Sequence, residues 1–404
     1  MILKKRNKKN IFLANIYGLI IFLNLLLIEP FFQISALGRV RYVLAISFVI
    51  ISLIVFSLKK EFKIKKKSLF YFLSNIIPYC IIFLVMIIRS FFTDLNILNQ
   101  ITVFLYWIIP ICLMQSAIYI FEAKAIDYTF WAIILNYSLC VVAYLNLYGF
   151  NGIINFFQYI EKGVSPLEVH ELTFTLGLFF IYYAFFENKE EKYHKQKIYI
   201  CVVCLFLGMK RIEIVALIII LLINSVLKKM NVKDKKKIMS ITSVFFIVIS
   251  ISYIILVRNG FLNYVSQKYN INFNTRLEAY DYFRDDYTIS PLYMGKGLGY
   301  VMDVLETLDR SVLYGIGDLH NDVLKLYIEL GFVLWLFYFV NFSVLQCRRL
   351  KKRYNVKIEE IYFYFMVFTF ILYLTDNVSR YLTYLLVFTM IPYAHYVKMI
   401  SNQE

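Results

Sequence analysis

The sequence predicts an all-α polytopic membrane protein. Hydrophobic residues make up 60% of the 404 residues and charged residues only 17%, which leaves too little polar surface to cover a soluble domain. Apolar runs of about twenty residues, the length that crosses the hydrocarbon core of a bilayer, recur along the chain. Short lysine-rich connectors separate many of these runs. We therefore expect about twelve transmembrane helices and one large extracytoplasmic loop late in the chain.

The apolar runs before the long polar stretch predict nine spans, which form a first region of residues 1–257. A basic segment opens the chain, and the apolar run after it has no small-residue cleavage site, so we expect a retained first helix. The seventh and eighth runs are one apolar stretch broken by Lys210 and Arg211, and each is short for a full crossing. The nine predicted spans are 11–28, 40–58, 68–88, 97–121, 128–148, 170–186, 197–209, 211–228 and 238–257.

Residues 258–321 predict the large extracytoplasmic loop, because they are too charged and too glycine-punctuated to lie in lipid. A last region, residues 322–404, follows this loop. It begins with polar residues, turns apolar about one helical turn later and ends in a cytoplasmic tail. Its three predicted spans are 322–346, 358–375 and 381–398.

The basic residues predict the orientation of the chain. Because cytoplasmic connectors carry an excess of lysine and arginine, both termini are expected in the cytoplasm and the loop outside, in the cytoplasmic (inner) membrane of a bacterium. The net charge of +16 is then explained by topology and by contact with anionic membrane lipid. Nucleic acid is not an expected partner, since its binding would need a folded basic domain. The basic connectors are 1–10, 59–67, 122–127, 187–197, 228–237, 347–357 and the tail.

Arginines are distributed differently from lysines. Most lysines lie in the cytoplasmic connectors, whereas most arginines lie outside or at the outer edge. The planar guanidinium suits bidentate binding of phosphate or carboxylate. Each of these arginines could instead anchor a helix at the interface, but the set indicates an anionic group at the outer face. They are Arg39, Arg41, Arg89, Arg211, Arg258, Arg276, Arg284, Arg310 and Arg380.

Two histidines fall on the outer side and are the candidates for proton transfer. His320 precedes an apolar helix, where Asn321 and Asp322 have the chemistry of a helix cap. A helix N-terminus also tends to keep a histidine neutral, as a general base requires. His170 opens the sixth span and either completes the site or is an ordinary interfacial residue. In the last outer turn, Asp376 and Arg380 either pair with each other or face the cavity.

Other catalytic templates are missing from the sequence. Residues 295–299 read GKGLG, which is not a P-loop and fits either a tight turn or a close backbone approach to substrate. Two outer histidines are too few for a zinc site, and the pair Asp285 and Asp286 lacks the spacing of a D-x-D motif. No G-x-S-x-G sequence occurs. We therefore predict no metal and no cofactor.

In order and spacing, the motifs of the loop and of the helix after it resemble those of the O-antigen polymerase and O-antigen ligase superfamily (Wzy and WaaL types). In that family an arginine usually opens an earlier helix in a Ser-Arg context. Here Met209 and Lys210 precede Arg211, which is a departure. The matching residues are Arg276, Tyr280, Tyr282, Pro291, Gly295, Gly297, Gly299, His320, Asn321, Glu329 and Gly331.

The resemblance implies a metal-independent, inverting glycosyltransferase of the helical membrane (GT-C-like) class. The donor would be a glycan on undecaprenyl pyrophosphate, and the acceptor a sugar hydroxyl of another lipid-linked repeat unit. Arg276 and Arg211 would stabilise the leaving pyrophosphate, and His320 would accept the proton of the hydroxyl. A flippase and a chain-length regulator would be partners. The candidates for substrate binding are Gly295, Gly297, Gly299, Asn321, His170, Arg284 and Arg380.

Three functions remain open at this point. A capsular or O-antigen polymerase is preferred over an O-antigen ligase, because a ligase needs a lipopolysaccharide core. The Lys-, Ile- and Asn-rich composition hints at an AT-rich genome and fits a Gram-positive capsule locus at least as well. A flippase for lipid-linked oligosaccharide, or another transporter, is the non-enzyme alternative. It should show two similar halves, and the sequence has no visible internal repeat.

Overall fold

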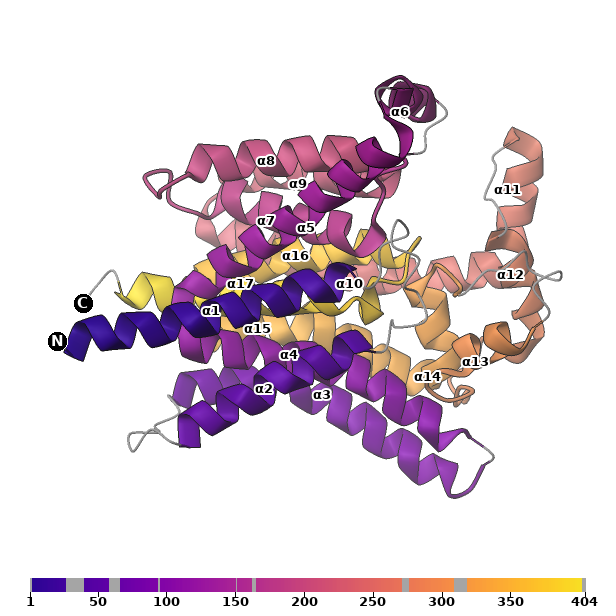
Figure 1. Ribbon diagram of the computed structural model, residues 1–404. Coiled ribbons are helices and arrows are strands. Elements are labelled where there is room, and N and C mark those ends of the chain that lie inside the picture. Colours follow the sequence, from indigo (N-terminus) through magenta and orange to yellow (C-terminus); the bar gives the residue numbers. More distant parts are fainter. Residues whose placement is uncertain are drawn as a thin grey trace.

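The computed structural model describes residues 2–26, 40–57, 66–93, 95–149, 151–161, 165–270, 276–308 and 318–401. The described residues form helices and contain no strand, so the all-helical prediction is confirmed for them. The long helices run roughly along one direction, and α11, α12 and α13 gather at one end of the bundle (Figure 1). We call this end the loop end, because these three helices belong to the predicted large loop. The start of α1 (Ile2–Leu26) and the end of α17 (Leu382–Ser401) lie at the opposite end (Figure 1).

A helix lies in each of the twelve ranges predicted as spans. Four helical segments among the described residues are long and apolar enough to cross a membrane: Lys66–Ser90, Ile97–Tyr148, Val232–Arg258 and Asp322–Arg353. These segments fit a helical membrane protein. The helices are α1 (Ile2–Leu26), α2 (Val40–Ser57), α3 (Lys66–Ser90), α4 (Ile97–Phe121), α5 (Ala125–Tyr148), α7 (His170–Phe185), α8 (His194–Gly208), α9 (Arg211–Lys228), α10 (Val232–Arg258), α14 (Asp322–Val340), α16 (Val356–Tyr373) and α17 (Leu382–Ser401).

Shorter elements connect these helices, and the described part of the predicted loop is largely helical. Residues 271–275 and 309–317 of that loop lie outside the described residues, as do Arg39 and Arg310 of the predicted outer arginines. The short elements are α6 (Asn151–Glu161), α11 (Phe261–Tyr269), α12 (Arg276–Tyr282), α13 (Tyr300–Thr307), α15 (Gln346–Arg353), the 3₁₀ turns η3 (Glu122–Lys124), η4 (Arg284–Asp286) and η6 (Val378–Arg380), and the π-helical turn η5 (Asn341–Leu345).

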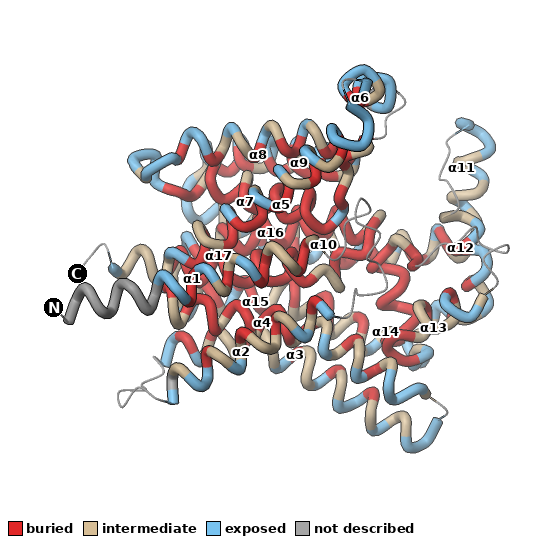
Figure 2. The backbone as a smooth tube through the Cα atoms, viewed as in Figure 1, coloured by how far each residue is buried: buried red, intermediate tan, exposed pale blue. Residues whose placement is uncertain are grey.

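Helices α16 and α17 form the centre of the bundle. Nearly all side chains of α16 from residue 361 onward and of α17 up to residue 396 are buried (Figure 2). Helices α2, α3, α9 and α10 instead expose large apolar side chains, among them Leu53, Leu84, Leu222 and Phe245. Apolar side chains facing outward are what a bilayer would cover. The burial pattern therefore agrees with a membrane protein whose polar groups are gathered inside.

Two local features bring polar side chains to the loop end. Met209, between α8 and α9, adopts a left-handed backbone with φ 43°, which breaks the apolar stretch into two helices and leaves Lys210 in the turn. A buried ion pair joins Arg41 of α2 to Glu171 of α7 at 2.7 Å. Glu171 also accepts a hydrogen bond of 2.6 Å from the backbone N–H of Thr383 in α17. These bonds tie three helices together beside the turn between α16 and α17.

Candidate functional site

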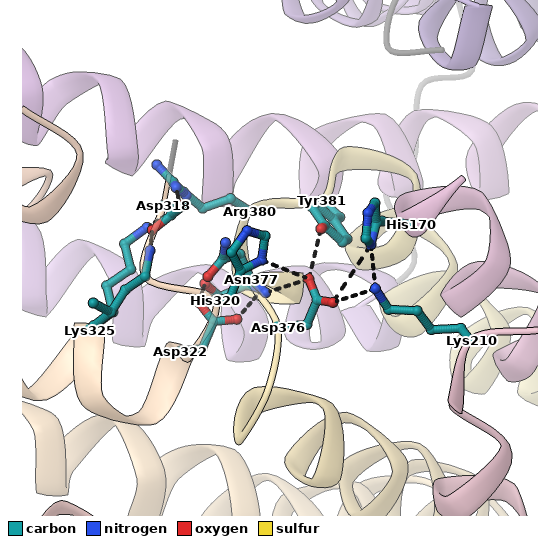
Figure 3. Close-up of polar contacts among 12 residues, drawn as sticks. His170, Lys210, Asp318, His320, Asp322, Lys325, Asp376, Asn377, Arg380 and Tyr381 are labelled. Atoms are coloured by element: carbon teal, nitrogen blue, oxygen red, sulfur yellow. Dashed lines mark hydrogen bonds and ion pairs between the residues drawn. The ribbon is translucent and has the colours of Figure 1, made fainter. Parts of the chain in front are cut away.

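Asp376, in the turn between α16 and α17, is the centre of a polar cluster (Figure 3). Its side chain is fully buried. Oδ1 accepts hydrogen bonds of 2.9 Å from the Tyr381 hydroxyl and the Asn377 backbone N–H. Burial by itself raises the pKa of Asp376, but the imidazoles of His170 and His320 and the charge of Lys210 outweigh it and hold the pKa well below its ordinary range. Asp376 is therefore an anion near neutral pH.

His320 faces this carboxylate from the segment before α14. Its Nδ1 lies 4.0 Å from Oδ1 of Asp376. The side chain is 37% exposed although Nδ1 is buried, so the open part of the ring points away from Asp376. The backbone of His320 is left-handed, with φ 50°, a conformation that is uncommon for residues other than glycine. Sparsely populated backbone conformations cluster at active sites, and this one motivates the hypothesis that His320 is a functional residue.

His170, at the start of α7, approaches the other oxygen of the same carboxylate. Its Nδ1 lies 3.8 Å from Oδ2 of Asp376 and 2.6 Å from Nζ of Lys210. Both predicted outer histidines thus meet at one carboxylate, and neither is an isolated interfacial residue.

Lys210 is the cation of the cluster. Besides His170, its Nζ contacts Oδ2 of Asp376 at 3.2 Å (Figure 3). It also donates to Oε1 of Glu168 at 2.5 Å. Arg211, the predicted catalytic residue, has an exposed side chain on the first turn of α9. The contacts to Asp376 and His170 are therefore made by the lysine that precedes the predicted arginine.

Asn321 joins the helix cap to two tyrosines. Its Oδ1 accepts the Leu324 N–H at 2.9 Å, and its amide donates to the hydroxyls of Tyr253 at 2.8 Å and Tyr280 at 3.3 Å. Burial raises the pKa of the Tyr280 phenol, and the hydrogen bonds with Asn321 and Tyr253 and the charge of Arg276 oppose this rise. Arg276, the first residue of α12, thus lies close enough to act electrostatically on this hydroxyl.

A second set of polar contacts fixes the segment that carries His320. Asp318 pairs with Lys325 at 2.9 Å and also contacts the guanidinium of Arg380 (Figure 3). Asp322 accepts hydrogen bonds from the Ser379 N–H at 2.8 Å and from its hydroxyl at 2.5 Å. Arg380 therefore pairs with Asp318, whereas one of the two expectations was a pair with Asp376. These bonds hold the turn that carries Asp376 against the segment that carries His320.

The glycine-rich turn packs on α14. Gly295, Gly297 and Gly299 have φ of 82°, 98° and 83°, which only glycine adopts readily. A Cβ on Gly295 would meet the backbone of residues 329–331, where α14 is kinked at Gly331. The Lys296 N–H donates to the Ile328 carbonyl at 2.8 Å. The turn approaches the backbone of α14 closely, whereas the close approach expected from the sequence was to substrate, which stays a prediction.

Two further arginines contact the loop. Arg89 of α3 donates from Nη2 to the Gly295 carbonyl at 3.0 Å, so it fastens the glycine-rich turn to α3. Arg284, a predicted substrate-binding residue, pairs with Asp281 on α12. Its Nε is buried and has no hydrogen-bond partner within the described chain. Of the predicted site residues, the structure gathers His320, Asn321, His170 and Arg276 near Asp376 and Tyr280, and it places Gly295 and Arg284 in other contacts.

Sequence reasoning gave no catalytic role to Asp376, Lys210 or Glu168, and did not mention Tyr381. A signal for Lys210 was present, because an ionisable residue inside an apolar stretch marks a functional site by default. Within the described ranges, no group of three or more His, Cys, Asp or Glu side chains is arranged to hold a metal ion. The cluster can hold a proton on an imidazole and stabilise negative charge with a lysine.

No family model matches the chain, and no curated protein or solved structure matches it. The geometry of the cluster and the motifs of the loop are therefore the basis for inferring a function.

Proposed function

We propose that the protein is a polysaccharide repeat-unit polymerase of the cytoplasmic membrane. It would transfer a glycan from undecaprenyl pyrophosphate to a sugar hydroxyl of another lipid-linked repeat unit at the outer face. In this proposal the helices in the twelve predicted ranges are the membrane spans, both termini are cytoplasmic, and the loop end faces outward. The observation that carries the proposal is the pair of His320 and Asp376 at the loop end, beside the motifs shared with the polymerase and ligase superfamily.

In this pair, the carboxylate of Asp376 prepares His320 to accept the proton of the attacking hydroxyl. A carboxylate facing Nδ1 favours the tautomer with the proton on Nδ1 and leaves the Nε2 lone pair free. The acceptor oxygen forms a bond to the anomeric carbon while the bond from that carbon to the pyrophosphate oxygen breaks. The electron pair leaves with the pyrophosphate, and the hydroxyl proton passes to His320. Direct attack of this kind inverts the anomeric configuration.

The leaving pyrophosphate needs charge stabilisation more than it needs an acid. Arg276, near the hydroxyl of Tyr280, supplies one cation. Lys210 supplies a second and takes the place that the resemblance gives to Arg211. Asn321, which follows the base in the sequence, donates hydrogen bonds to Tyr253 and Tyr280. The reaction in this form requires no metal, and a flippase and a chain-length regulator are the expected partners.

The test is the polysaccharide ladder of cells that lack the native gene and carry a plasmid copy. His320→Asn is preferred to His320→Ala as the test variant, because asparagine tolerates the left-handed backbone better than alanine does. We expect a ladder with wild type and a single-repeat band with His320→Asn, at equal protein level in the membrane. His395→Asn is the matched control, because His395 lies in α17 toward the opposite end, where its Nδ1 is 3.3 Å from the Tyr182 hydroxyl. A full ladder with His320→Asn would contradict the assignment of the base.

A flippase for lipid-linked oligosaccharide is the second candidate. The observation in its favour is the break between the short helices α8 and α9, which holds Lys210 and, one turn further, the buried Glu213. Both carboxylate oxygens of Glu213 are buried and have no hydrogen-bond partner in the described chain. Discontinuous helices with buried ionisable residues are typical of transporters. Lipid-linked repeats trapped inside the deletion cells, with no surface glycan, would favour this candidate.

A ligase would give a third pattern in the same cells. Lipid-linked polymer would still form without the protein, and only its transfer to a final acceptor would be lost. The ladder would then persist in the lipid-linked fraction of the deletion strain. A polymerase predicts that this fraction holds single repeats only.

A further inference from the structure

A groove lies at the end of the bundle opposite Asp376, where α7 and α9 end and α10 and α16 begin. Its volume is about 390 Å³. Residues from all four helices line it, so it exists only in the folded bundle. The lining includes Phe185, Phe186, Lys228, Lys235, Lys357 and Tyr364.

The groove has a positive lining. Lys228, Lys235 and Lys357 come from α9, α10 and α16, and Glu360 is the one acidic residue among the lining side chains. Lys235 pairs with Glu360 at 3.5 Å. Lys228 and Lys357 are exposed, so their ammonium groups can reach a ligand in the groove. Lysine is a compact point charge that suits a phosphate group.

The base of the groove is aromatic and apolar. The ring of Tyr364 packs on Phe186 at 5.3 Å and on Phe185 at 5.9 Å between centroids. The Tyr364 hydroxyl donates to Oδ1 of Asn224 at 3.2 Å, which fixes the ring. A soluble anion such as inorganic phosphate would bind the lysines but would leave this apolar base in contact with water.

The outer face of α9 continues the apolar surface away from the groove. Leu221 and Ile214 lie about two and about four turns before Lys228, on the same face of the helix as this lysine, and are 43% and 36% exposed. An acyl chain can lie along such a face while its head group stays at the lysines. A cationic rim, an aromatic base and an adjoining apolar helix face together match an amphiphile with a negative head group.

We propose that this groove binds the phosphate head group of an anionic glycerophospholipid. In the orientation proposed above the lipid belongs to the cytoplasmic leaflet, which carries a negative surface potential. The site is independent of the chemistry at Asp376. A failure of the polymerase assignment would therefore leave the lipid site untouched, and the reverse also holds.

The test uses the purified full-length protein in neutral detergent, with short-chain phosphatidylglycerol as the probe. Binding is measured by the rise in melting temperature with probe concentration. The groove variant is Lys228→Gln with Lys357→Gln, and the control is Lys233→Gln with Lys237→Gln, which removes two exposed lysines of α10 outside the groove lining. We expect the groove variant to bind roughly thirtyfold more weakly and the control to bind like wild type.

Three results would overturn the proposal. An equal loss in the control variant would mean that bulk surface charge attracts the lipid. Equal stabilisation by short-chain phosphatidylcholine or by inorganic phosphate would rule out an anionic lipid as the specific occupant. No stabilisation of wild type by phosphatidylglycerol would mean that the groove binds no such lipid. If the double variant does not fold, the single Lys357→Gln variant, changed only at an exposed side chain, should lose about fivefold in affinity.

Discussion

Nδ1 of His320 lies 4.0 Å from Oδ1 of Asp376, although α14, α15 and α16 separate the two residues in the sequence. The two segments are joined directly beside this contact, because the side chain of Asp322 accepts two hydrogen bonds from Ser379. The hydrogen bonds between Asp322 and Ser379 therefore help to set the distance between His320 and Asp376. A group that approaches the open part of the His320 ring meets an imidazole already oriented by the fold.

The depressed pKa of Asp376 predicts a loss of stability in acid. A carboxyl whose folded pKa lies below its ordinary value of 3.8 stabilises the protein fully above that value. This contribution is lost as pH falls through the folded pKa. We expect wild type to melt higher than Asp376→Asn at pH 7, and the difference to shrink below about pH 4. Melting curves of both proteins in detergent from pH 7 to pH 3 measure it, and a difference independent of pH would contradict the prediction.

Lys210 and Arg211 offer a matched pair of neighbouring cations. Lys210 contacts Glu168, His170 and Asp376, whereas the side chain of Arg211 is exposed. Lys210→Gln should reduce the rate of polymer formation about 10²-fold, in the range for removing one group that stabilises transition-state charge. Arg211→Gln should reduce the rate of polymer formation by a smaller factor. The length and amount of polymer at equal protein level provide the comparison, and a larger loss with Arg211→Gln would return the role to the arginine.

Asn321 has two roles that substitutions can separate: it caps α14, and it contributes to the proposed site beside Tyr280. Asn321→Ala removes the cap of α14 and should cost about 1 kcal/mol of stability. Asn321→Asp keeps a capping oxygen but adds negative charge beside Tyr280 and the field of Arg276. It should make little polymer, and the comparison is made at equal protein level because burial of the added charge also costs stability. Asn321→Ser, which caps without a charge, is the control and should retain more activity than the aspartate variant.

The glycine-rich turn should tolerate no side chain at Gly295. An alanine there would meet backbone atoms of α14 and adopt an unfavourable φ, so Gly295→Ala should lose at least about 2 kcal/mol of stability. Gly18→Ala is the matched control, because a Cβ there has nothing within 4 Å, and its stability should be unchanged or higher. Thermal unfolding gives both values. A Gly295→Ala protein that melts like wild type but makes no polymer would assign the turn to substrate contact instead.

The positions of the long helices could be predicted from the sequence, whereas the partners of the site residues could not. Apolar runs predicted the twelve helical ranges, and the charges at Lys210 and Arg211 marked the break between α8 and α9. The cap at Asn321 followed from residue type. The meeting of His170, His320 and Asp376 depends on how α7, α14, α16 and α17 pack, which no local pattern encodes.

Local backbone geometry decided two other points. Lys210 reaches the cluster because Met209 is left-handed, and nothing in the residue types distinguishes this lysine from Arg211 as the inward-facing cation. The sequence at Gly295 indicates either a tight turn or a close backbone approach to substrate, and the structure packs this turn on the backbone of α14. Its partner, the kink at Gly331, is a second glycine with a positive φ of 75°, and the motif that contains Gly331 does not reveal that the two glycines meet.

The left-handed backbone of His320 has a consequence for any library of substitutions at this position. Among the variants that fold best, glycine, asparagine and aspartate should be enriched, because they tolerate positive φ, and β-branched residues should be depleted. Selection for polymer, if the imidazole is the base, should instead keep histidine alone. The ranking of variants by folded protein would then oppose their ranking by polymer made. Measuring abundance and activity together would separate what the backbone requires from what the chemistry requires.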